Sequence, residues 1–299
     1  MTSNQRVLVA ALLALWMASA GAASAQAPAD TAQVWRIVTR DGNEYVGKIV
    51  ERVAGAIRLE TDTIGVVSIR EELIVRMEVV DARRRDSGEI WARNPQATRY
   101  FWGPNGYGLR KGEGYYQNVW IFFNQISIGV TDHATIGLGL VPLFLWGGEA
   151  FPAWITPKLS LPIVPDKFNL GIGALAGTLV GGFGSEDGAA GIVYGIGTYG
   201  SRDANVSFGL GYGFAGRDWG RHPALTLSAM SRQGKRSYLL FESYIISTGE
   251  ESAGLALFGG RYIASRISID YGGMVPFGFE VDRLIVLPWL ALVVPFGNR

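Results

Sequence analysis

The feature that most constrains this chain is a regular hairpin spacing in its C-terminal two thirds. Short polar turns recur at Thr131-Asp132-His133, Pro165-Asp166-Lys167, Ser201-Arg202-Asp203, Gln233-Gly234-Lys235 and Ala264-Ser265-Arg266. Their midpoints lie 34, 36, 32 and 31 residues apart, which fits two membrane-length strands plus two connections. Longer connections fall between them, around residues 147–152, 181–188, 216–222, 247–253 and 277–283. Short turns that alternate with long loops are typical of transmembrane antiparallel β-barrels.

The residues between these turns alternate as barrel strands do. From residue 205 to 214, one face carries Val206, Phe208, Leu210, Tyr212 and Phe214, and the other carries only Asn, Ser and Gly. Residues 168–173 and 267–271 repeat the pattern. An apolar face can also pack the core of a soluble sandwich, so the even hairpin spacing favours the barrel.

Composition narrows the possible chemistry and location. The chain has no cysteine, so disulfides and thiol-based sites are excluded. A net charge of +1 provides no basis for nucleic-acid binding. Residues 1–25 are expected to be a cleaved signal peptide, with Arg6, an apolar run over 7–20 and the small residues Ala23-Ser24-Ala25. The later apolar run 284–296 is broken by two prolines and is too short for a transmembrane helix.

Residues 26–80 are expected to form a small periplasmic β-domain. Five short alternating runs predict strands at 34–38, 45–50, 56–59, 66–69 and 74–79, with Asp41-Gly42-Asn43 as the first hairpin turn. The pattern resembles the small SH3-like and Sm-like barrels. Such a domain suits docking of a periplasmic protein, or a plug or lid that steadies the barrel. Residues 81–97, with Arg83-Arg84-Arg85, are predicted to be a linker with a short helical turn.

The strand count follows from the turns. Counting residues 115–130 as one strand, five short turns and five long loops join eleven segments. The segment Thr98-Arg99-Tyr100-Phe101-Trp102 is expected to be a twelfth wall strand, followed by an outer loop over 105–114. The prediction is therefore a barrel over residues 98–299 with about 12 strands and both termini in the periplasm.

Several short motifs carry a resemblance to known proteins. They are Asn94-Pro95, Thr98-Arg99-Tyr100-Phe101, the run from Lys111 to Asn118, Phe123-Asn124-Gln125 and Gly129-Val130-Thr131-Asp132. Over roughly residues 90–299 the chain resembles an uncharacterised group of bacterial outer-membrane β-barrel proteins. The resemblance implies a barrel among the lipids of a Gram-negative outer membrane, with no known activity and no catalytic residues. One departure is that Phe296 is followed by Gly297-Asn298-Arg299, whereas many such barrels end on an aromatic residue.

Catalytic chemistry finds little support in the sequence. The two histidines are His133, in a short turn, and His222, in a long loop. A hydrolase at the outer rim that uses His222 is an alternative, but Ser228 lies six residues away along one strand, beyond hydrogen-bond reach. The spacing of His, Asp and Glu predicts no metal or cofactor site, and the glycine-rich runs lack the Lys-Ser/Thr of a phosphate loop. We therefore expect no enzymatic activity.

Charged residues within the strands are the remaining functional candidates. Successive side chains of a strand point to opposite faces. Apolar neighbours that face lipid therefore place Lys158, Glu242 and Asp270 toward the lumen, and Arg261 is expected to join them. Lipid-facing charge at mid-bilayer is unfavourable by about 2–4 kcal/mol, which favours this inward placement. These four residues can form an ion-pair network that packs the interior, or they can line a narrow polar path.

The expected function is a narrow passive pore for small polar solutes, and the alternative is a non-conducting scaffold for a periplasmic partner. A twelve-stranded barrel lies between small barrels filled by side chains and large ones with an aqueous channel. Many predicted inward positions are glycine: Gly137, Gly139, Gly171, Gly173, Gly209, Gly211 and Gly213. The space that they leave must hold water, the periplasmic domain, a loop such as 105–114, or inward-bent strands.

Overall fold

The structure is a computed structural model that describes residues 33–62, 64–80, 82–84, 90–143, 150–180, 188–247, 252–264, 267–278 and 285–297. The chain divides into one compact unit that ends at Pro95 and another that begins at Gln96. The expected signal peptide lies outside the described residues. Within those residues there is no helix of the length and apolarity needed to cross a membrane.

The first unit contains a five-stranded antiparallel sheet, which confirms the five predicted strands. Its strands are β1 (Val34–Thr39), β2 (Glu44–Val53), β3 (Ala56–Thr61), β4 (Gly65–Arg70) and β5 (Ile74–Val80), in the order β4-β3-β2-β1-β5. A single 3-10 turn, η1 (Glu71–Leu73), precedes β5. Alternate residues bury Ile37, Ile57, Leu59 and Ile69 as one core. The SH3-like or Sm-like assignment stays a prediction.

A short hairpin lies within the expected linker. Strand β6 (Ala82–Arg84) pairs antiparallel with β7 (Ile90–Ala92), in place of the helical turn predicted there. Residues 85–89, which include Arg85, lie outside the described residues.

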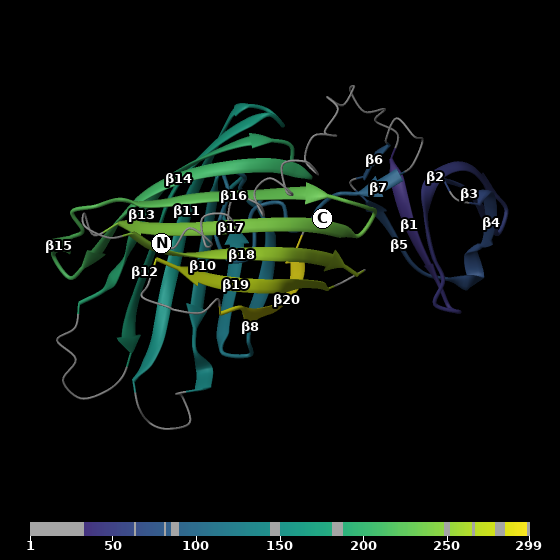
Figure 1. Cartoon of the computed structure of the whole chain (residues 1–299). Helices are drawn as coiled ribbons and strands as arrows, with labels where there is room; N and C mark the ends of the chain where they lie inside the picture. The colour runs from purple at the N-terminus through teal and green to yellow at the C-terminus, as the bar shows by residue number, and fades with distance from the viewer. Residues whose placement is uncertain are drawn as a thin grey trace. The chain divides into compact units, whose positions relative to one another are not determined.

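The second unit is a closed antiparallel barrel of twelve strands. Figure 1 shows its strands side by side in one curved wall. The wall strands are β8 (Glu113–Val119), β9 (Phe123–Gly129), β10 (Ala134–Leu140), β11 (Phe151–Val164), β12 (Phe168–Val180), β13 (Ala190–Gly200), β14 (Ala204–Ala215), β16 (Ala224–Arg232), β17 (Ser237–Ser247), β18 (Ser252–Ile263), β19 (Ser268–Phe277) and β20 (Leu287–Gly297). The two-residue strand β15 (Asp218–Trp219) pairs antiparallel with the last residues of β14. Pairing of β20 with β8 closes the wall, so the fold class and the number of strands are confirmed.

The first two strands of the wall are formed by other residues than expected. Residues 98–102 are not a wall strand, and their one β-bridge joins Arg99 to Pro104. The run 115–130, predicted as a single strand, is instead the hairpin of β8 and β9, with its turn at Trp120-Ile121-Phe122. The expected outer loop over 105–114 is also wrong, because residues 105–109 are buried and β8 begins at Glu113. The first two of these errors cancel in the strand count.

The wall turns apolar side chains outward and polar side chains inward. On β14 the outward Val206, Phe208 and Leu210 are each at least 40% exposed, whereas the inward Asn205 and Ser207 are at most 4% exposed. This is the reverse of a water-soluble protein, in which buried positions are mainly apolar.

Candidate functional site inside the barrel

A stretch of chain just before the first wall strand occupies the barrel interior. We call residues 96–109 the inner segment; all of them are buried except Trp102 and Pro104, which are half-buried. The segment folds back on itself through the bonds Tyr100 N to Gly103 O and Asn105 N to Thr98 O. Its glycines allow close contact with the wall, since a Cβ on Gly106 would lie 2.6 Å from the carbonyl oxygen of Asn169 on β12.

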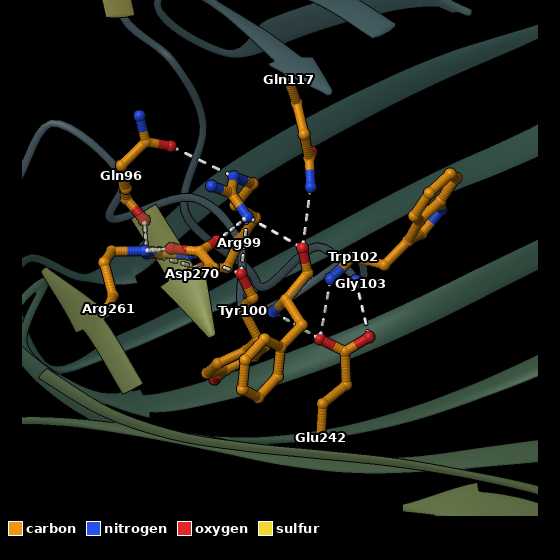
Figure 2. A network of polar contacts seen from close by, with 10 residues as sticks. Gln96, Arg99, Tyr100, Trp102, Gly103, Gln117, Glu242, Arg261 and Asp270 are labelled. Carbon is orange, nitrogen blue, oxygen red and sulfur yellow. Dashed lines mark hydrogen bonds and ion pairs between the residues drawn. The ribbon is translucent and has the colours of Figure 1, made fainter. Parts of the chain in front are cut away.

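Ionic contacts join the start of the inner segment to β18 and β19 (Figure 2). Arg99 Nη1 lies 2.8 Å from Asp270 Oδ2, and Arg261 donates from Nε to Asp270 Oδ1 at 2.6 Å. The remaining donors of Arg261 bond to the carbonyl oxygens of Gln96, at 2.9 Å, and Tyr100, at 2.6 Å. Two guanidinium groups therefore share one buried carboxylate, and backbone carbonyls accept several of their other donors, while Arg99 Nη2 is buried without a hydrogen-bond partner among the described residues.

Glu242 on β17 binds the tip of the inner segment (Figure 2). Its Oε2 accepts hydrogen bonds from the backbone N–H of Phe101, at 2.7 Å, and of Trp102, at 3.0 Å. Its Oε1 accepts one from Gly103 N at 2.8 Å and another from the Tyr244 hydroxyl. Hydrogen bonds to a charged acceptor are about twice as strong as neutral ones, so this carboxylate fixes three consecutive residues.

Lys158 on β11 performs the complementary role further along the inner segment. Its Nζ donates to the carbonyl oxygens of Asn105, at 3.1 Å, and Tyr107, at 2.6 Å. A lysine side chain has only donors, and two of them are used here on backbone oxygens. Lys158 thus holds two carbonyl groups of the inner segment against β11.

Neutral polar side chains complete the attachment. Tyr100 OH donates to Asn205 Oδ1 on β14 at 2.7 Å. Further bonds reach Gln117 on β8, Thr135 on β10 and Thr198 on β13. Together with the charged contacts, eight of the twelve wall strands bond to the inner segment.

Aromatic rings gather beside the Glu242 contact. Trp102 of the inner segment lies 5.7 Å from Phe123, 6.1 Å from Trp154 and 6.4 Å from Trp289, measured between ring centroids. Trp120, in the turn between β8 and β9, lies 5.1 Å from Trp289 and 6.3 Å from Phe123. We call these five residues the aromatic cluster. Such edge-on and tilted pairs add about 0.5–1.5 kcal/mol each beyond simple burial.

All four candidate lumen residues are buried, and each forms a hydrogen bond with the inner segment. The structure brings Arg261 and Asp270 together, whereas Glu242 and Lys158 bind separate parts of the inner segment. That they line a water-filled path stays a prediction. Part of the space over the inward glycines is taken by neighbouring side chains, such as Thr156 over Gly137 and Trp154 over Gly139.

Sequence reasoning missed Arg99. The four candidate residues carry two positive and two negative charges, so their balance gave no reason to look for a fifth charge. The density of glycine and proline over 103–108 was the available signal that this region is not a strand.

The hydrolase alternative gains no support. His222 is exposed, and among the described residues it bonds to no serine or carboxylate. His133 is also exposed, and its Nδ1 lies 3.2 Å from the carbonyl oxygen of Ser160. In the described part of the chain, no group of three or more His, Cys, Asp or Glu residues is placed to hold a metal ion.

Known proteins were compared with the chain by sequence and by structure. No protein-family model matches the sequence, and no curated protein matches it. The fold is similar to that of the KdgM porin, with a TM-score of 0.41 and 9% identity, over 63% of this chain and 99% of that chain. It is also similar to a loop-deletion mutant of OmpT, an outer membrane protein of Vibrio cholerae, with a TM-score of 0.33, 12% identity and coverage of 88% and 96%.

Proposed function

We propose that this protein is an outer-membrane β-barrel whose interior is closed at rest by the inner segment, and which serves as a membrane scaffold. Of the two functions expected from the sequence, we favour the non-conducting scaffold over the passive pore. The observation that carries it is the attachment of residues 96–109 to eight wall strands. A segment held at so many points takes up lumen space that a path for polar solutes would need.

The exposed apolar wall supports the membrane location. Outward side chains such as Phe208, Leu159 and Ile172 are each more than 55% exposed, on three different strands. A soluble protein rarely presents so large an apolar surface, whereas lipid-facing strands of a barrel require it. Closure of the wall leaves no unpaired strand edge in the hydrocarbon layer.

The side of the membrane follows from the connections. Strand β8 begins, and β20 ends, at the same end of the barrel as the short turns, which in outer-membrane barrels face the periplasm. The five-stranded sheet precedes β8 and is therefore proposed to lie in the periplasm. There it would dock a protein partner. Protease should cleave it in permeabilised cells and spare it in intact ones, and cleavage in intact cells would refute this placement.

Conductance in planar bilayers tests closure. The full chain should give no steady current, whereas deletion of residues 96–109 should give one, because the wall side chains that now hold the segment would face water. A double variant, Glu242→Ala with Lys158→Ala, keeps the segment but removes two of its anchors and should give intermittent current. Steady current from the unmodified protein would overturn the proposal and favour the passive pore.

A further inference from the structure

We propose that the aromatic cluster is a binding site for an acyl chain that enters from the membrane over a low part of the barrel wall. The inference rests on the membrane location proposed above. It adds a ligand class and an entry route that closure of the barrel does not require.

The wall is low where β8 and β9 meet. Each of these strands has seven residues, whereas β11 has fourteen and β12 thirteen. Seven residues tilted by about 40° span about 18 Å of thickness, and the apolar band of an outer-membrane barrel is about 25 Å tall. Because β8 starts beside the last residues of β20, at the short-turn end, the shortfall lies at the opposite end. The hairpin tip therefore lies within the hydrocarbon layer.

The sequence of the tip fits this depth. The turn is Trp120-Ile121-Phe122, and Ile121 is 80% exposed. Trp120 and Ile121 both have positive φ, at 51° and 71°, which hairpins in water normally assign to Asn or Gly. A β-branched residue in this region is strained, and an exposed apolar turn is unfavourable in water. Contact of the hairpin tip with lipid explains why apolar residues occupy this turn.

Two asparagine side chains pair with polar groups at the tip. Asn118 Nδ2 donates to the carbonyl oxygen of Ile121 at 3.1 Å and to Asn124 Oδ1 at 2.8 Å. Asn124 Nδ2 donates to the carbonyl oxygens of Ile121, at 3.3 Å, and Phe122, at 3.0 Å. An irregular turn in hydrocarbon needs this internal pairing, because each unsatisfied group there costs several kcal/mol.

The aromatic cluster lies directly behind this low wall and determines the ligand class. Trp120 belongs to the tip itself, and Trp102, Phe123 and Trp154 are half-buried. The indole N–H groups of Trp120 and Trp154 are already bonded, to Pro288 O and Gln125 Oε1, both at 2.8 Å, whereas the indole N–H of Trp289 is buried without a partner among the described residues. None of the five side chains is charged. With one buried, unpaired N–H group among five rings of the described chain, the site suits an uncharged hydrocarbon chain more than a polar solute.

The depth of the tip is tested first, with the cysteine-free full chain carrying one fluorophore-labelled cysteine in liposomes. Label at Ile121→Cys should be quenched by lipids brominated on the acyl chain, as should label at Leu159→Cys on the outer wall of β11. Label at Ser201→Cys, in a short turn, should not. Quenching at 159 but not at 121 would overturn the inference while the membrane location stands. Quenching at neither would contradict the membrane location itself.

Binding is tested with a fatty acid that carries a diazirine at mid-chain. After photolysis, labelled peptides should contain residues of the aromatic cluster, and unlabelled palmitate should compete. The double variant Trp102→Ala with Trp154→Ala should lower this labelling severalfold, while Trp219→Ala, a tryptophan outside the cluster, should not change it. Labelling confined to the outer wall, or unchanged in the double variant, would overturn the acyl-chain site.

Discussion

Arg99 Nη1 donates a hydrogen bond to Asp270 Oδ2 at 2.8 Å, between residues 171 positions apart in the chain. Asp270 also pairs with Arg261, so a single buried carboxylate joins the inner segment to two wall strands. Removal of that charge would leave two buried guanidinium groups without a counterion.

The variant Asp270→Asn should therefore lose about 3–5 kcal/mol of unfolding free energy, the usual effect of breaking a buried ion pair. Urea titration in liposomes, followed by the folded band on unheated gels, measures the change. Asp218→Asn is the matched control, because Asp218 is exposed in the short strand β15. An unfolding midpoint for Asp270→Asn equal to that of the control would contradict the role assigned to this carboxylate.

Glu242 should control the mobility of the inner segment more than the stability of the wall. In Glu242→Gln the acceptor loses its charge, and its amide group places donors opposite the backbone N–H of residues 101–103. Hydrogen exchange of the peptide that contains these residues should accelerate, while exchange of the wall strands stays slow. Ser243→Ala, on the adjacent outward position of β17, should leave the peptide protected. Equal protection in Glu242→Gln would mean that the carboxylate does not hold the segment.

Gly106 is predicted to tolerate no side chain. A Cβ there would meet the backbone of Asn169 at 2.6 Å, and backbone cannot move aside cheaply, so Gly106→Ala should lose about 1–3 kcal/mol. Gly195→Ala on β13 is the control, because a Cβ there meets nothing within 4 Å. Thermal unfolding of both variants, compared with the parent, checks the difference. Similar losses at the two positions would show that Gly106 does not pass so close to β12.

The wall strands could be predicted from the sequence because the pattern that marks each strand lies within about ten consecutive residues. Alternation of Val206 and Phe208 with Ser207 and Gly209 marks a strand with one lipid face, and polar turns mark its ends. The hairpin of β8 and β9 escaped prediction because Trp120-Ile121-Phe122 contains no turn residue. In the membrane, an apolar tip is the stable choice.

The inner segment could not be predicted because its partners are distant in sequence. The run from Thr98 to Trp102 ends in three aromatic residues, which favour strands and are frequent in the wall, so local composition does not distinguish the two. Only the positions of Asp270, Glu242 and Lys158 around the closed wall show that residues 99–107 are held inside. Parity alone predicted an inward direction for those three side chains but not what they bind.

The central claim is that residues 96–109 lie inside the barrel, and a disulfide measures it directly. A Cβ built on Gly108 lies 3.0 Å from Ser160 Cβ on β11, while disulfides hold Cβ atoms about 3.8 Å apart. The chain has no other cysteine, so any intramolecular disulfide in Gly108→Cys with Ser160→Cys reports this contact. Oxidation in native membranes, followed by peptide mapping, should find nearly complete cross-linking. The pair Gly108→Cys with Ser228→Cys, on the more distant strand β16, should find none. A folded barrel in which the first pair stays reduced, or in which both pairs cross-link equally, would contradict the account.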